Sequence, residues 1–194
     1  SLVNSAICVR PPDSVFDRWA TRYDLERTDR AHLDPHFDAI ADFLGIAPTP
    51  EEVQGPRNLL FRDGCDQMGV SSEPISRNVK GCRGSGECFT GCRSRAKQSM
   101  DVSYVPAALR AGARVFTSVQ VQEIRRSGRR VTGVSGQVVA PFTHGAAKGR
   151  SHRFRIEAKA VVLAAGCTAT PVLLQHSDDL ANASGQVGEN LQFH

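Results

Sequence analysis

The feature that most constrains the fold is a short, continuously apolar run, Ala160–Gly166, followed by signals for the start of a helix. The run is long enough for a strand and far too short to cross a bilayer. A strand that is apolar on both faces is typical of a parallel sheet covered on both sides. Thr170 can cap the following helix, and Pro171 suits its first turn. We therefore expect an α/β fold.

The junction between this strand and its helix is also a candidate nucleotide site. Small residues at the carboxyl end of a parallel strand let a ligand approach the backbone, and a helix N-terminus attracts phosphate. Glycine also occurs in such turns for steric reasons alone, so both interpretations stay open. The sequence has no Gly-x-Gly-x-x-Gly after a strand and no phosphate-binding loop ending in Gly-Lys-Ser/Thr.

Periodic patterns supply the other expected elements. Arg114–Arg126 alternates apolar and polar residues, which predicts a strand, and Ser127–Arg129 is its turn. A return strand is expected over about 131–139, and another over Phe154–Lys159. The expected helices run from the cap Asp34 to Gly45, over about Arg57–Met68 with Gly69 as the exit, and over Pro106–Ala111.

A loop system is expected over Pro74–Ser99, because its glycines, cysteines and basic residues show no helical periodicity. It is either a solvated basic loop or a loop laid over a ligand, since glycine permits close backbone approach. Three of the chain's six cysteines have the spacing Cys82-x5-Cys88-x3-Cys92. A metal site would need a fourth ligand close by, so we expect reduced or locally paired thiols and no metal.

Composition excludes several classes of protein. With 40% hydrophobic residues the chain has too much apolar surface for a disordered protein. The net charge of +4 is too small to indicate nucleic acid by itself. Arginines cluster at 125–126, 129–130 and 150–155 with few aromatic residues among them for base stacking, so we expect no nucleic-acid partner. No membrane span is expected either.

Five segments, taken in order, resemble the glucose–methanol–choline (GMC) oxidoreductases, in particular their cysteine-bearing bacterial branch. Each motif is modest, but the five together extend over nearly the whole chain. The matching segments are Ser1–Pro11 (the tail of Gly-Gly-x-Ser/Thr-x-x-Asn), Asn78–Pro106 with its three cysteines, Ala113–Val134 (a strand pair), Val161–Leu174 (the second flavin strand) and Gly188–His194 (Gly-x-Asn-Leu-x-x-His).

The resemblance implies a partial FAD-binding, Rossmann-like domain with a helical and loop segment that covers the cofactor. It implies oxidation of an alcohol carbon, with hydride transfer to flavin N5 and a base that removes the hydroxyl proton. The implied FAD-binding residues are Ser1, Asn4, Ser5 and Ile7 near the isoalloxazine and pyrophosphate, Val121 through its backbone at the adenine, and Ala165 and Gly166 at the phosphates and ribose.

The resemblance also implies what is missing. The family's Gly-x-Gly-x-x-Gly would precede Ser1, and its catalytic histidine would follow His194, so no catalytic residue is expected in this chain. Arg93 replaces a proline common in relatives. Both ends look cut, so we expect an internal segment of a larger enzyme that is inactive without the remainder of that enzyme.

The expected division of the chain has four parts. Residues 1–11 form the tail of the flavin motif, 12–100 the helical and cover segment, 101–176 the FAD-binding strands and helix, and 177–194 the lead into a substrate domain. The expected partners are a small-molecule alcohol substrate and the remainder of the same enzyme, and a cytoplasmic location is expected from clustered cysteines without a signal segment. The alternative is a stand-alone binding protein with a flavin-fold remnant, binding a metal through its cysteines.

Overall fold

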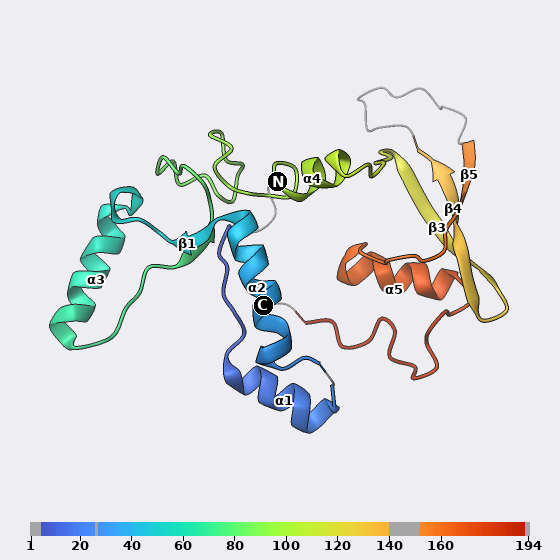
Figure 1. Ribbon diagram of the computed structural model, residues 1–194, viewed down its shortest axis with the longest axis horizontal. Helices are drawn as coiled ribbons and strands as arrows, with labels where there is room; N and C mark the ends of the chain where they lie inside the picture. The colour runs from blue at the N-terminus through green and yellow to red at the C-terminus, as the bar shows by residue number, and fades with distance from the viewer. Residues whose placement is uncertain (1–4, 26, 140–151, 193–194) are drawn as a thin grey trace. The chain divides into compact units, whose positions relative to one another are not determined.

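The structure is a computed structural model that describes residues 5–25, 27–139 and 152–192. The chain divides into two compact units, Ser1–Arg114 and Val115–His194 (Figure 1). The four-part functional division expected from the sequence stays a prediction. None of the described helices is both long and apolar enough to span a membrane.

The first unit is mainly helical, with two very short strands. Strands β1 and β2 pair antiparallel, with Arg77 opposite Ala47, and Ile7 forms an isolated bridge to Arg77. A single 3-10 turn, η1, lies between β1 and the third helix. The elements are α1 (Asp13–Tyr23), α2 (Arg30–Leu44), β1 (Ile46–Pro48), η1 (Glu51–Val53), α3 (Pro56–Met68), β2 (Ser76–Asn78) and α4 (Tyr104–Arg110).

In this unit the sequence predicts where helices end more accurately than where they begin. α2 ends at Gly45 and α3 at Gly69, both with a positive φ that only glycine adopts easily. The predicted start of α2 at Asp34 is wrong. The cap is Asp29, whose carboxylate accepts a hydrogen bond from the His32 N–H at 3.0 Å, and Pro35 therefore lies inside the helix.

Helix α1 was not expected, because its segment looks polar. The sequence nevertheless contains a helical pattern, since the aromatic residues Phe16, Trp19 and Tyr23 repeat at helical spacing. Phe16 is buried, and its ring packs edge-on against Trp19 with 5.6 Å between ring centroids.

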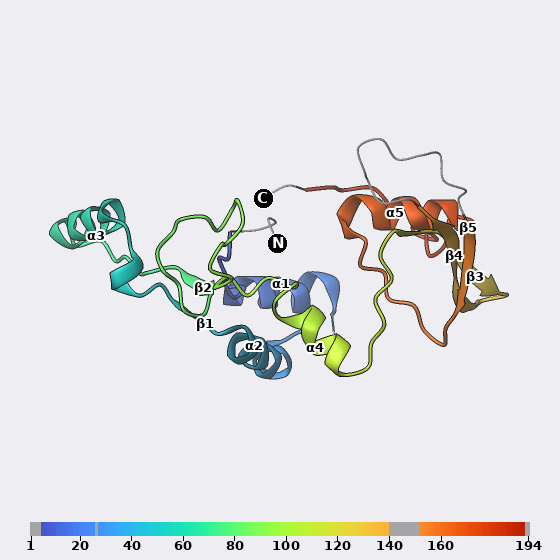
Figure 2. The ribbon, with the colours of Figure 1, turned by 90° about the horizontal axis from the view of Figure 1, so that it is seen from above.

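The second unit is a three-stranded antiparallel sheet with one helix. The strands follow the order β3 (Val119–Ser127), β4 (Arg130–Val138), β5 (His152–Glu157), and the helix is α5 (Gly166–His176). Figures 1 and 2 both show α5 alongside this sheet, and its contacts are with β3. The core lies between them, where Ile124 is buried and its N–H donates to the Ser177 hydroxyl at 2.9 Å.

The turn at 127–129 and the return strand are confirmed, but three boundaries differ. β5 covers His152–Glu157 and not Phe154–Lys159. β3 begins at Val119 and not at Arg114, because Ser118 has a φ of 56°, which a strand cannot continue. α5 begins at Gly166, five residues before Pro171, with Ala165 as its cap.

The predicted strand over Ala160–Gly166 is wrong for the structure as described. Residues 160–164 have no regular structure, and Val162 is 89% exposed. A parallel strand depends on neighbouring strands for all of its hydrogen bonds. The second unit offers only an antiparallel sheet, and no described strand pairs with this run. The chain is still of mixed α/β class, as predicted.

Candidate functional site

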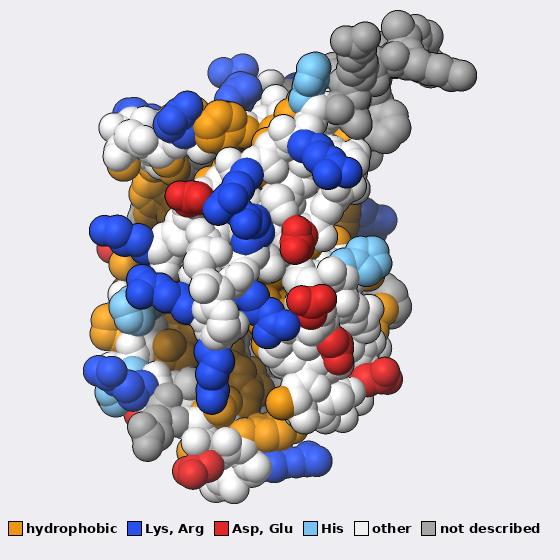
Figure 3. All heavy atoms as spheres, turned by 90° about the vertical axis from the view of Figure 1, so that its right-hand side faces the viewer, with side chains coloured by type: hydrophobic (Ala, Val, Ile, Leu, Met, Phe, Trp, Pro, Cys, Tyr) orange, Lys and Arg blue, Asp and Glu red, His pale blue; other side chains and the backbone are white. Residues whose placement is uncertain are grey.

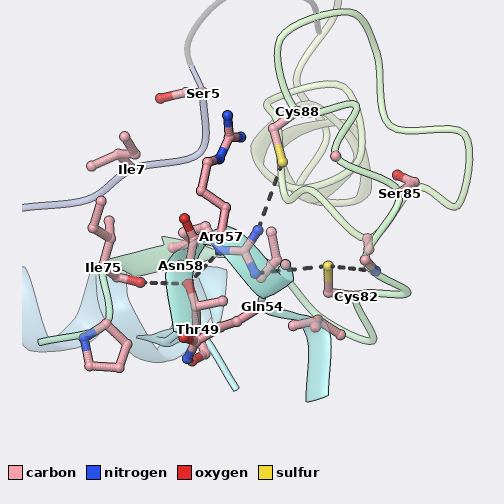
Figure 4. Close-up of a pocket in the computed structure, with 18 of the residues that line it drawn as sticks. Ser5, Ile7, Thr49, Gln54, Arg57, Asn58, Ile75, Cys82, Ser85 and Cys88 are labelled. Atoms are coloured by element: carbon pink, nitrogen blue, oxygen red, sulfur yellow. Dashed lines mark hydrogen bonds between the residues drawn. The ribbon is translucent and has the colours of Figure 1, made fainter. Parts of the chain in front are cut away.

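A cavity of about 580 Å³ opens within the first unit, and Figure 4 shows its walls. The lining comes from the first described residues, from the segment around η1 and α3, and from the glycine-rich loop after β2. Ile7, Val53, Phe61, Ile75 and Phe89 give it apolar surface. A cavity of this size and character suits a small organic ligand.

Arg77 is the cation best fixed in this cavity. Its backbone is held in β2 between Ala47 and Ile7. Its Nε donates to the Thr49 hydroxyl at 2.7 Å, and that hydroxyl donates to the Ile75 carbonyl at 2.7 Å. The guanidinium plane is therefore set by β1, β2 and the residue that follows β1.

The outer edge of the Arg77 guanidinium faces two thiols. Nη1 lies 3.9 Å from the sulfur of Cys88, and Nη2 lies 3.9 Å from the sulfur of Cys82 (Figure 4). Sulfur is a weak acceptor, and both distances are at the long limit for such a hydrogen bond. The two terminal nitrogens of the side chain, Nη1 and Nη2, therefore make only weak hydrogen bonds.

The charge around the cavity is positive. Among the described residues that line it, three are arginines and one, Glu73, is acidic. Arg62 is neutralised by Glu51 at 3.0 Å and Asp63 at 3.4 Å. No carboxylate within the described ranges comes within ion-pair distance of Arg77; the acid near its loop, Glu87, pairs with Arg93.

All six cysteines are free thiols, and Cys82, Cys88 and Cys92 line the cavity. The pKa of the Cys92 thiol is lowered, chiefly by its hydrogen bond with the Ser94 hydroxyl and also by the Lys97 N–H. Among the described residues, no group of three or more His, Cys, Asp or Glu is arranged to hold a metal ion.

Two of the sequence-predicted FAD residues lie on this cavity. Ser5 and Ile7 both line it, on the chain segment that runs beside β2. Ser1 and Asn4, the other two predictions at this end, lie outside the described residues, as does His194.

The remaining predicted FAD residues belong to the second unit. Val121 lies in β3 opposite Gly136 and is 37% exposed. Ala165 caps α5 and is exposed, and Gly166 has a φ of 88° with no atom within 4 Å of where a side chain would begin. An uncovered backbone at a helix N-terminus is an arrangement that can bind phosphate, and the role of these residues at FAD stays a prediction.

The arginine clusters seen in the sequence meet at a shallow hollow of about 550 Å³ in the second unit. Arg126 pairs with Asp178 at 3.4 Å, and Arg155 pairs with Glu157 at 2.8 Å. No aromatic side chain lines the hollow. Figure 3 shows basic side chains spread over the face drawn, with acidic ones among them. This mixture is typical of a solvated surface and not of a nucleic-acid interface.

The sequence did not single out Arg77 or Thr49. Arg77 was one of six basic residues in a loop, and nothing local distinguishes it from the others. Arg77 is distinguished only by tertiary structure, because the pairing of β2 with β1 brings the Thr49 hydroxyl to its Nε.

Comparison with known proteins identifies the family of the chain. The family model described as GMC oxidoreductase matches residues 1–194. The chain is 33% identical over 194 residues to an uncharacterized GMC-type oxidoreductase of Mycobacterium tuberculosis, covering 100% of this chain and 29% of that protein. It is 24% identical over 196 residues to a long-chain-alcohol oxidase of Arabidopsis thaliana, covering 100% of this chain and 26% of that protein.

An oxygen-dependent choline dehydrogenase of Staphylococcus aureus is 30% identical over 219 residues, which cover 100% of this chain and 37% of that protein. The chain thus spans between a quarter and two fifths of the length of these relatives. The matching model is that of the family's FAD-binding domain. The chain belongs to the GMC oxidoreductase family, in the domain that binds FAD.

Proposed function

We propose that this chain is part of an FAD-dependent oxidoreductase that oxidises the CH–OH carbon of an alcohol. The observation that supports the proposal is the match to the family over residues 1–194, together with relatives named for alcohol and choline oxidation. Bound FAD would supply the hydride acceptor for such a reaction. The base that removes the hydroxyl proton is proposed to lie outside this chain.

The chain's own part in this proposal is to hold and cover the cofactor. The backbone of Ala165 and Gly166 is proposed to receive the pyrophosphate, because it is exposed and unobstructed at the start of α5. Val121 is proposed to meet the adenine through backbone groups. Ser5 and Ile7 are proposed to lie against the isoalloxazine side, with the loop after β2 excluding water from the site.

The cofactor part of the proposal is tested with Gly166→Val in the full-length protein. A valine there adds strain at a positive φ and places a side chain where the pyrophosphate would pass. We expect FAD affinity to fall by about tenfold or more, the loss of one well-formed phosphate contact. The measurement is flavin content by visible absorption, with dialysis against known FAD concentrations.

The matched control is Gly128→Val, which has the same strain at a φ of 57° in an open hairpin turn of the same unit. It should retain the flavin. Equal flavin loss in both variants would mean that Gly166 acts only through the stability of the unit, and the proposed contact would be wrong.

The reaction is tested by mixing the flavin-loaded full-length protein with primary alcohols without oxygen. Loss of the oxidised flavin spectrum with one alcohol and not with the matching alkane supports alcohol oxidation. The 194-residue chain alone should show no turnover. Turnover by this chain would contradict the proposal that the base lies elsewhere.

A further inference from the structure

We propose that Arg77, with Cys82 and Cys88 beside it, forms a binding site for the carboxylate group of an organic acid whose apolar part occupies the cavity. The first observation is the orientation of the guanidinium. Thr49 accepts from Nε, and Nη1 and Nη2 donate to the two thiol sulfurs, each at 3.9 Å. This pair of donors matches a carboxylate with two parallel hydrogen bonds, for which the two thiols have to move aside.

The second observation is the missing counter-ion. A half-buried guanidinium normally has a carboxylate beside it, because an unpaired charge away from water is costly. Arg77 instead has one hydroxyl and two thiol sulfurs at 3.9 Å. Within the described part of the chain, no acid comes within 4.0 Å of it. A ligand carboxylate would supply the negative charge that none of the described residues places beside Arg77.

The third observation is the surface around the fork. The cavity of about 580 Å³ has apolar walls that include Phe61, Ile75 and Phe89. This arrangement suits a molecule with one acid group and an apolar body. It does not suit inorganic phosphate, which has no apolar part to cover these walls.

The two thiols make the site directly measurable. Iodoacetate and iodoacetamide alkylate a thiolate identically: a sulfur–carbon bond forms, iodide leaves, and the thiol proton passes to solvent. Only iodoacetate has a carboxylate for Arg77 to bind. The experiment compares the rates of the two reagents at each cysteine of the FAD-loaded full-length protein, read by peptide mass spectrometry. Cys167 is the internal reference, because it is exposed and lies in the other unit.

We expect the iodoacetate-to-iodoacetamide ratio at Cys82 or Cys88 to exceed that at Cys167 by about tenfold, the value of one charge-assisted contact. Arg77→Met should abolish this preference. Arg57→Met is the matched control, because Arg57 also lines the cavity but contacts neither sulfur, and it should keep the preference.

A measurement on the unmodified protein keeps the proposal testable if Arg77→Met does not fold. Decanoate should slow the alkylation of Cys82 and Cys88 by iodoacetamide without slowing that of Cys167. Decanol, sodium chloride at equal ionic strength and inorganic phosphate should leave all three rates unchanged. Equal ratios at all three cysteines, or protection by decanol or phosphate, would overturn the proposal. So would a preference that appears only after FAD is removed, because Arg77 would then serve the cofactor.

Discussion

Cys92 shows at the residue scale how local hydrogen bonds set the chemistry of a side chain. The pKa of its thiol is lowered by the Ser94 hydroxyl and the Lys97 N–H. A lower pKa means more thiolate at a given pH, so its alkylation rate should rise at lower pH than for an ordinary cysteine.

Ser94→Ala should move the rate–pH curve of Cys92 toward higher pH, because the leading stabiliser of the thiolate is gone. The measurement is the rate of iodoacetamide alkylation of Cys92 against pH, by peptide mass spectrometry. Ser85→Ala is the control, because Ser85 lines the same cavity and has no hydrogen bond to Cys92. An unchanged curve in Ser94→Ala would show that the hydroxyl does not stabilise the thiolate.

Gly136 allows β3, β4 and β5 to approach closely. A methyl group there would lie 2.0 Å from the Gln120 carbonyl and 2.9 Å from the Phe154 ring. Because backbone cannot yield as a flexible side chain does, Gly136→Ala should destabilise the sheet by about 3 kcal/mol.

Hydrogen exchange of the β3–β5 amides in the full-length protein measures this loss as faster exchange. Gly128→Ala, in the open turn between β3 and β4, should cost only about 1–2 kcal/mol of backbone strain. If the two variants exchange equally fast, the close approach at Gly136 does not limit the stability of the sheet.

The start of α2 gives a test at the scale of one element. Asp29→Ala removes the cap bond to His32 and should destabilise the first turn by about 1 kcal/mol. Asp34→Ala removes partly exposed ion pairs with Arg30 at 3.1 Å and Arg10 at 3.8 Å and should cost less, about 0.5 kcal/mol. Hydrogen exchange over residues 30–36 ranks the two variants, and the opposite ranking would restore Asp34 as the helix start.

Helices and strands were predictable from the sequence where a residue type or pattern restricts the backbone conformation. Gly45 and Gly69 end their helices because each has a positive φ, and the alternating run predicted over Arg114–Arg126 contains β3. Helix starts were less predictable, since Asp29 and Asp34 are chemically the same and only the tertiary context selects one. The cofactor residues came from the family resemblance, whereas Arg77 required the pairing of β1 with β2.

At the scale of the whole molecule, the run 160–165 is the clearest mismatch between sequence and structure. The sequence predicts a strand covered on both faces, whereas Val162 is 89% exposed. The chain spans only 29% of a relative of 33% identity, so we expect the pairing strands to come from the rest of the protein.

Hydrogen exchange of 160–165 should therefore be slow in the full-length protein and fast in the 194-residue chain. Residues 130–138 of β4 are the control and should be protected in both, because their partner strands lie in this chain. Fast exchange of 160–165 in both samples would show that the run is not a strand in the intact enzyme.

The hairpin of β3 and β4 has a kinetic consequence. Val119 pairs with Val138 and Ser127 with Arg130, so every pairing contact joins residues close together in the chain. Contacts of this kind form quickly, because little entropy is lost in closing the loop. As the ribosome makes the polypeptide from its N-terminus, this hairpin can form before β5 and α5 emerge from the ribosome, and it can serve as the template on which they assemble.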